Sequence, residues 1–158
     1  VLAAATTVRQ ALRALDLDAF PKTTGGRGLH VVVPLAPHAD WSDCLAFSRA
    51  LCEAIERSAT GTFTTRFAKA GRDRKILLDY LRNNRTNTSI AAYSTRARAG
   101  APVSVPLAWS ELRPALDPQA FTLVTVPRRL ARLRADPWKD YWTCRQKLTA
   151  QRLKAVMR

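Results

Sequence analysis

A glycine-rich segment followed by an apolar run is the feature that most limits how this sequence can fold. Residues 22–30 have the sequence KTTGGRGLH, and VVVPL follows at 31–35. The three glycines tolerate positive φ and let the backbone turn tightly or approach a ligand closely. Apolar residues flank this turn, and they alternate with other side chains from residue 29 onward. We therefore predict two strands, at 20–23 and 29–35, joined by a glycine turn.

The polar residues of the turn are of the kind that binds phosphate. Thr24, Arg27 and His30 offer a hydroxyl, a guanidinium and an imidazole within a few positions, and such donors suit a phosphate group. A hairpin turn that binds nothing has the same composition, so this segment alone leaves both interpretations open. The glycine spacing matches neither the P-loop nor the dinucleotide fingerprint, so it does not specify the phosphate compound.

Helical periodicity alternates with short extended segments in the remaining sequence, which predicts a mixed α/β (α+β) fold with a partly antiparallel sheet flanked by helices. Residues 99–118 hold four of the nine prolines and are expected to form an extended connector. The other predicted elements are helices at 2–15, 41–58 (with Asp40 as N-cap), 63–70, 128–134 and 141–158, and strands at 75–81, 90–95 and 121–126.

The charge balance points to a polyanionic partner. Lys and Arg number 26 against 12 Asp and Glu, a net charge of +14, and the excess concentrates in 66–98 and after residue 126. Nucleic acid is the natural partner of such a chain, although a charged surface that merely solvates the protein is the simpler alternative. With 47% hydrophobic residues, the 158-residue chain is long enough for one compact domain, and no stretch is apolar enough to predict a membrane span.

The cysteines indicate a reducing compartment. Cys44, Cys52 and Cys144 are odd in number and lack paired spacing, and there are only two histidines, so we expect free thiols, no ordinary zinc site and a cytoplasmic protein. The first five residues do not resemble a signal peptide. Without an initiator Met, the chain is expected to begin inside a longer protein.

Asp79 is a carboxylate within an otherwise apolar run, and an ionised group in such a run needs a cation. Two partners remain open: an arginine in a structural salt bridge, or a divalent metal ion that also binds triphosphate oxygens.

Several motifs, in order, resemble the polymerase domain of bacterial ATP-dependent DNA ligase D, a member of the archaeo-eukaryotic primase superfamily. Residues 1–138 would form the C-terminal part of that primase-like domain, and 139–158 a basic helical tail outside it. The matching segments are 22–30, Arg72, 75–83, 92–98, 100–107, Trp109 and 111–112.

The resemblance implies template-dependent nucleotidyl transfer, with a preference for ribonucleotides, in gap filling and end extension during non-homologous end joining. Thr24, Arg27, His30 and Arg96 match residues that hold the incoming triphosphate, and Arg72 matches one near the nucleotide and template. Asp79 matches a ligand of two Mn or Mg ions, so Asp79 and His30 are the expected catalytic residues. The implied partners are nucleoside triphosphates, DNA ends or a primer-template, ligase and phosphoesterase domains, and the bacterial Ku end-binding protein.

The sequence also departs from the family pattern. Thr24 replaces the usual Ser and Arg27 the usual Lys, and both keep the donor type. The family's aspartate pair is expected just before the first helix, where this chain starts; Asp16 and Asp18 have the right spacing but follow that helix. A fragment with one metal-binding aspartate is expected to be weakly active or inactive. The alternatives are a non-catalytic basic nucleic-acid-binding module of the same fold and an α/β domain whose basic surface only solubilises it.

Overall fold

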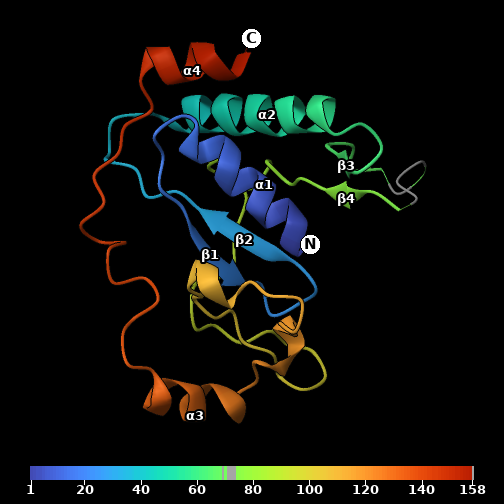
Figure 1. Ribbon diagram of the computed structural model, residues 1–158, viewed down its shortest axis with the longest axis vertical. Helices are drawn as coiled ribbons and strands as arrows, with labels where there is room; N and C mark the ends of the chain where they lie inside the picture. Colours follow the sequence, from blue (N-terminus) through green and yellow to red (C-terminus); the bar gives the residue numbers. More distant parts are fainter. Residues whose placement is uncertain (69, 71–73, 158) are drawn as a thin grey trace. The chain divides into compact units, whose positions relative to one another are not determined.

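The computed structural model describes residues 1–68, 70 and 74–157 (Figure 1). Its contacts divide the chain into two units, which are described separately. Unit 1 comprises Val1–Ala5, Ala19–Pro34 and Ile90–Cys144, and unit 2 comprises Thr6–Asp18, Leu35–Ser89 and Arg145–Arg158. Each unit is therefore assembled from three separate stretches of sequence, and each joins segments far apart in the chain.

Unit 1 is built on the predicted hairpin. Strands β1 (Phe20–Thr23) and β2 (Leu29–Val32) pair antiparallel, with Lys22 opposite His30. A third extended segment, residues 103–107, runs beside β1: Thr23 N donates to Val105 O at 3.0 Å, and Leu107 N donates to Pro21 O at 3.0 Å. The hairpin is thus fastened along β1 to a segment some eighty residues further along the sequence.

That third segment forms the core of unit 1. Val103, Val105 and Leu107 are at most 3% exposed and cluster with Val126. The remaining packing comes from half-buried apolar residues around the cluster, namely Leu29, Leu112, Leu116 and Phe121. The connector predicted at 99–118 is extended and deeply buried only at 102–107, where its apolar residues face this cluster; a 3₁₀ turn follows at Trp109–Glu111, and residues 113–115 are exposed.

Short helices complete unit 1. The 3₁₀ turns η1 (Trp109–Glu111) and η2 (Pro118–Ala120) precede α3 (Thr125–Arg132). Indole groups tie the ends of the unit to β1, since Trp109 Nε1 donates to Ala19 O at 2.6 Å and Trp138 Nε1 donates to Pro21 O at 3.0 Å.

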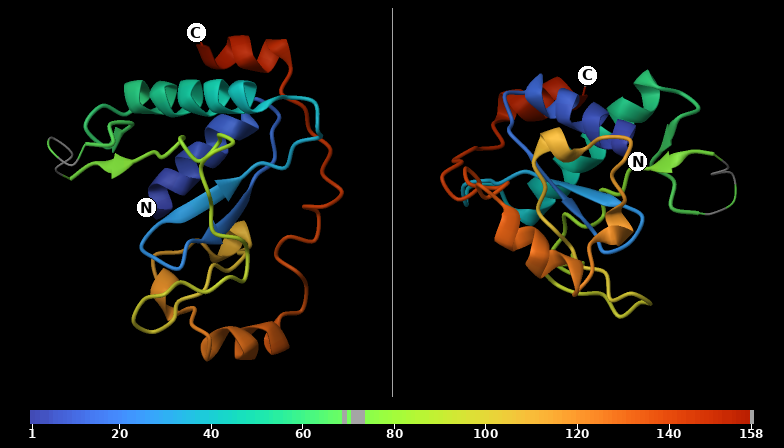
Figure 2. Two further views of the ribbon diagram at one scale, coloured as in Figure 1. Left: turned by 180° about the vertical axis from the view of Figure 1, so that it is seen from behind. Right: turned by 60° about the horizontal axis from the view of Figure 1, so that its bottom comes forward.

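Unit 2 contains the long helix α2 (Trp41–Ser58), which starts in a capping box between Asp40 and Asp43, as the N-cap prediction required. Its buried residues are Phe47, Leu51 and Ile55. The last helix, α4 (Ala150–Met157), lies along α2 in both side views (Figures 1 and 2). The strands β3 (Phe63–Thr64) and β4 (Ile76–Leu77) form a short parallel pair.

Residues near the end of the chain are part of unit 2. The Gln146 side chain accepts from Asp18 N at 2.5 Å and donates to Asp18 O at 2.9 Å. Arg152 donates to Leu15 O at 2.7 Å and to Asp16 O at 2.9 Å, just beyond the C-terminus of α1 (Leu2–Arg13). Both carbonyls lie in the turn that follows α1, so Arg152 fixes this turn from a distant part of the sequence.

The mixed α/β prediction, with an antiparallel hairpin and helices, is confirmed. The helix predicted at 63–70 is wrong: Phe63 and Phe67, four apart, imitate a helical face, but Phe63 is buried in β3 and pairs with Ile76. The Glu56 carboxylate fixes the extended backbone by accepting from Thr65 N at 3.0 Å and Thr65 Oγ1 at 2.6 Å.

Four other predicted elements are much shorter than expected or absent from the described residues. The strand at 75–81 is limited to β4, because Asp79 Oδ1 accepts from Leu81 N at 3.1 Å and turns the chain. Residues 90–95 contribute only the isolated bridge between Thr95 and Val103. The strand at 121–126 gives way to α3 because the Thr122 hydroxyl accepts from Thr125 N at 3.2 Å at the helix start. The final helix spans only α4, not 141–158.

Candidate functional site

The glycine turn between β1 and β2 is surrounded by arginines. Gly25 has φ +63°, and a Cβ there would lie 2.9 Å from Arg96 Cγ and 3.1 Å from Pro102 O. A Cβ on Gly26 would lie 3.3 Å from Arg98 Nη1 and 3.7 Å from Arg96 Nη1. Gly25 is therefore needed for Arg96 to approach the turn so closely, whereas a Cβ on Gly26 would require only a small shift of the Arg98 side-chain end.

The Thr24 side chain closes the turn. Its hydroxyl donates to Gly28 O at 3.1 Å, and the Thr24 carbonyl accepts a long 3.5 Å contact from Arg96 Nη1. A Cβ on Gly28 would lie 3.6 Å from the Thr24 hydroxyl oxygen. The Thr24 oxygen thus shapes the loop internally while it stays beside the loop's glycines and Arg96.

Arg27 and His30 complete the set predicted for unit 1. Arg27 is exposed at the tip of the turn, and His30 is half-buried on β2, on the face of the hairpin that carries Lys22. Thr24, Arg27 and Arg96 are thus gathered around one short loop, and His30 follows on the strand that leaves it. The arrangement concentrates positive charge and hydrogen-bond donors at a turn with little side-chain bulk, which suits a phosphate group.

Arg98 is a residue of this loop environment that the sequence reasoning did not assign. A tight turn places it, because Arg98 N donates to Arg96 O at 2.8 Å and Ala101 N donates to Arg98 O at 2.9 Å. Gly100, with φ +79°, lies in the same turn. The available signal was the spacing of two arginines by one residue, which matches the period of an extended chain.

A buried polar network holds the base of the hairpin. Lys22 Nζ donates to Ile90 O and, at 2.9 Å, to Ser104 Oγ, and Ser104 Oγ donates to Thr23 O at 2.6 Å. The Thr23 hydroxyl donates to Val103 O at 3.1 Å and accepts from Val105 N at 2.7 Å. Lys22 is 4% exposed, and burial lowers the pKa of its ammonium group to about 8.

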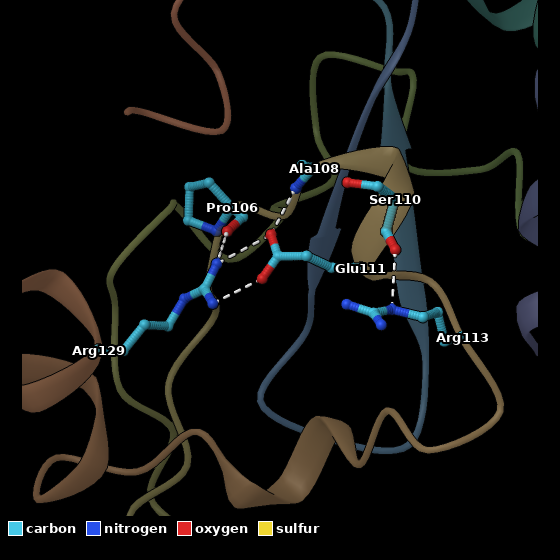
Figure 3. Close-up of polar contacts among 6 residues, drawn as sticks. All are labelled: Pro106, Ala108, Ser110, Glu111, Arg113 and Arg129. Atoms are coloured by element: carbon cyan, nitrogen blue, oxygen red, sulfur yellow. Dashed lines mark hydrogen bonds and ion pairs between the residues drawn. The ribbon is translucent and has the colours of Figure 1, made fainter. Parts of the chain in front are cut away.

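An ion pair fixes the opposite end of the 103–107 segment. Arg129 of α3 contacts Glu111 in a bidentate pair, with Nη1 to Oε1 at 2.6 Å and Nη2 to Oε2 at 3.0 Å (Figure 3). Glu111 Oε2 also accepts from Ala108 N at 2.7 Å. Burial alone would raise the pKa of Glu111, but the hydrogen bonds from Arg129 and Ala108 N outweigh it and lower that pKa. The pair joins α3 to η1 and so stabilises the segment that carries the hairpin.

Asp79 lies in unit 2. Its side chain is 36% exposed and forms an ion pair with Arg82, with Oδ2 3.5 Å from Nε, so the salt-bridge alternative is present in this structure. Cys52 of α2 lies close enough that the Asp79 charge adds to the effect of burial, which raises the pKa of the thiol to about 12. Among the described residues, no three His, Cys, Asp or Glu side chains gather as a metal site.

The remaining predicted site residue, Arg72, lies outside the described residues. The described part of the chain contains no helix that is both long and apolar enough to cross a membrane. In the described part of the chain, Cys44 and Cys52 are not joined in a disulfide. The metal-ligand role of Asp79 and the nucleotide contacts of the other site residues stay predictions.

Unit 1 thus has a glycine-rich hairpin with Arg96 and Arg98 beside it, in a mixed α/β fold, an arrangement that suits a phosphate group. The family model described as the LigD primase-polymerase domain matches residues 1–138. This chain therefore belongs to the LigD primase-polymerase domain family.

Proteins from three bacteria illustrate the relationship. The multifunctional non-homologous end joining protein LigD of Pseudomonas aeruginosa is 40% identical over 137 residues, which are 86% of this chain and 16% of that protein. The bifunctional protein LigD of Bacillus subtilis is 30% identical over 140 residues, 88% of this chain and 23% of that protein. The polymerase domain of Mycobacterium tuberculosis ligase D, solved in complex with DNA, matches with a TM-score of 0.81 at 29% identity, covering 89% of this chain and 48% of that one.

This chain therefore spans less than a quarter of the two LigD proteins and about half of the solved polymerase domain.

Proposed function

We propose that this chain is part of a template-dependent nucleotidyltransferase that extends DNA ends and fills gaps during non-homologous end joining. Its unit 1 hairpin would bind the triphosphate of the incoming nucleotide. The observation that carries the proposal is the approach of Arg96 and Arg98 to the glycine turn, where a single added methyl group at Gly25 would collide with Arg96. Family membership supports the reaction class.

The side chains suggest how this half of a site would act. Arg27 and Arg96 would neutralise charge on the triphosphate, and a guanidinium can bind two phosphate oxygens at once. His30 would donate to a phosphate oxygen, and Thr24 would rotate its hydroxyl from Gly28 O to the ligand. Stabilising the departing pyrophosphate in this way lowers the barrier to nucleotidyl transfer. Arg72 would lie near the nucleotide and the template strand.

A divalent metal ion, Mg²⁺ or Mn²⁺, would supply Lewis-acid activation of the phosphoryl group in the complete enzyme. Of the described residues, we propose Asp79 as one ligand, since carboxylate oxygens are preferred by both ions. One carboxylate that is already paired with Arg82 does not make a two-metal site. Any further carboxylates would come from outside the described residues, so we derive no catalytic step through a metal.

The proposed macromolecular partner is DNA, as a primer-template or a broken end. Its support is the net charge of +14 and the solved relative that is described in complex with DNA. Ribonucleotide preference, cooperation with ligase and phosphoesterase domains, an encounter with the Ku end-binding protein and a cytoplasmic location are proposals that rest on the family and on the odd number and spacing of the cysteines.

Nucleotide binding can be tested on the chain itself. Titration calorimetry with ATP in EDTA, which removes metal effects, should show binding that Arg96→Ala weakens about tenfold, the effect of losing one charged contact. Arg134→Ala is the matched control, because Arg134 is also exposed and basic but lies beyond α3. Equal loss in both variants would mean that ATP binds to general positive charge and not to the hairpin.

Catalysis requires the full-length protein as encoded. Incorporation of labelled ribonucleotide on a primed template with Mn²⁺ should be abolished by Asp79→Ala. Asp140→Ala is the control, because Asp140 is also an exposed aspartate, and it should leave incorporation unaffected. Retained activity in the Asp79 variant would exclude Asp79 as a metal ligand.

The second candidate function is a non-catalytic basic nucleic-acid-binding module. The ion pair between Asp79 and Arg82 favours it, because a paired carboxylate needs no metal. This alternative predicts DNA binding that weakens steeply with salt while the full-length protein incorporates no nucleotide. DNA binding without salt dependence would contradict both candidates.

A further inference from the structure

Lys22 is a buried cation whose role neither the family comparison nor the sequence reasoning assigns. It lies on β1 two residues before Thr24, yet its side chain is only 4% exposed. Lysine is almost never buried to this extent without a partner of opposite charge. Among the residues that the structure describes, its contacts are with the carbonyl of Ile90 and the hydroxyl of Ser104, and none is with a carboxylate.

These contacts join three segments that together surround the glycine turn. Lys22 itself begins the turn, Ile90 starts the segment that leads to Arg96, and Ser104 belongs to the strand-like segment beside β1. Ser104 N also donates to Ser94 O at 2.9 Å, so the same neighbourhood sets the approach of the residues just before Arg96. The ammonium group of Lys22 therefore lies where its displacement would move both the glycine turn and the segment that carries Arg96.

We propose that Lys22 is a positioning residue for phosphate binding, which holds the glycine turn against the Arg96 segment and adds an unneutralised buried positive charge beneath the turn. This inference rests on the proposed triphosphate site. A buried charge interacts more strongly with a nearby anion than an exposed charge does, because less water screens it. The lowered pKa of Lys22 agrees with a cation that has only neutral oxygens around it.

The charged and titratable groups on the elements around Lys22 are His30 on β2, and Tyr93 and Arg96 in the neighbouring segment. Burial raises the pKa of Tyr93 above its ordinary value, whereas burial lowers the pKa of Lys22 to about 8. Of these two groups, Lys22 is therefore the one that changes charge between pH 7 and 9.5.

The first experiment measures positioning without a ligand. In the wild-type chain, the ¹³C signals of the Thr24 methyl group and the Gly25 Cα should titrate with a midpoint near pH 8. In Lys22→Met, which keeps the length and volume of the side chain, this titration should vanish. A midpoint that persists in Lys22→Met would overturn the inference.

The second experiment measures affinity for ATP in EDTA at two pH values. At pH 7, Lys22→Met should bind about tenfold more weakly than the wild type, and at pH 9.5 the two should bind nearly equally, because the wild-type lysine is then neutral. Lys139→Met, at an exposed lysine of the same unit, should match the wild type at both pH values. A tenfold loss of equal size at both pH values would show that Lys22 only packs, which would refute the charge role.

The two experiments separate this inference from the function on which it rests. If the wild-type chain binds no ATP, the proposed triphosphate site fails, while the ligand-free titration still decides whether Lys22 positions the turn. If Lys22→Met does not fold, the wild-type titration remains as the test, and absence of a midpoint near pH 8 at the turn refutes the proposal.

Discussion

Replacing Gly25 with alanine is the sharpest test of how closely Arg96 packs against the glycine turn. The substitution meets two separate penalties at one position. Gly25 has φ +63°, which costs an L-residue about 1–2 kcal/mol. The added methyl carbon would also lie 2.9 Å from Arg96 Cγ and 3.1 Å from the backbone carbonyl of Pro102, and relief of such overpacking costs about 1–3 kcal/mol.

The expected total is a loss of about 2–5 kcal/mol in the free energy of unfolding of unit 1. The side chain of Arg96 can move, whereas the Pro102 carbonyl is held by Arg96 N at 2.9 Å, so displacement should fall mainly on the Arg96 side chain. Moving that guanidinium should also weaken ATP binding.

Gly100→Ala is the matched control. Gly100 also has positive φ, +79°, but a Cβ there would meet nothing within 4 Å. Its cost should therefore be the backbone term alone, about 1–2 kcal/mol, with ATP affinity unchanged. Urea denaturation of both variants gives the two free energies, and calorimetry with ATP gives the affinities. If the two variants lose equal stability and bind ATP equally well, the close approach of Arg96 to the turn is wrong.

Three further predictions concern groups away from the turn. Glu111→Gln should destabilise unit 1 by about 1–3 kcal/mol at neutral pH, because it leaves Arg129 partly buried without its anion. The folded-state pKa of Glu111 is lowered, so its contribution to stability is present above the unfolded-state pKa and is lost as pH falls through the folded-state pKa. Acid unfolding of the wild type and of Glu111→Gln, compared side by side, measures this pH-dependent contribution. Gln146→Ala should cost about 1–3 kcal/mol, because both backbone groups of Asp18 lose their partner, and a result near zero in urea denaturation would exclude that contact. The Cys52 thiol, with a pKa of about 12, should react with iodoacetamide at pH 8 far more slowly in the folded chain than in urea, and equal rates would contradict its burial.

Local sequence was sufficient where the deciding interactions are local. The hairpin was predicted because the glycines and the alternating residues after them lie within about fifteen positions, and α2 because Asp40 and Asp43 cap their own helix. It was insufficient for 63–70, where a helical spacing of two phenylalanines is overruled by pairing with Ile76. Propensity is a weak signal that tertiary contacts often override.

The residues of the candidate site also divide into those that local sequence groups together and those that tertiary contacts bring in. Thr24, Arg27 and His30 lie within seven positions of sequence, so their grouping could be predicted without the tertiary structure. Arg96 was assigned through the resemblance, and the structure brings it to Gly25, 71 positions earlier in the sequence. Lys22 was missed because the sequence gives no signal that this lysine is buried, and Arg98 was missed because its spacing from Arg96 does not show which distant segment it contacts.

By itself, the sequence determined the position of the glycine turn, the hydrogen-bond donors that the turn carries and the positive charge of the chain, since these depend on residue identity and short spacing. Tertiary structure alone decided that residues 103–107 form the core, that Lys22 is buried with neutral partners, and that Arg96 and Arg98 face the turn. The physical reason is the distance in sequence. Contacts between segments eighty residues apart depend on how apolar surfaces pack together, and no local pattern encodes which distant segment supplies the partner.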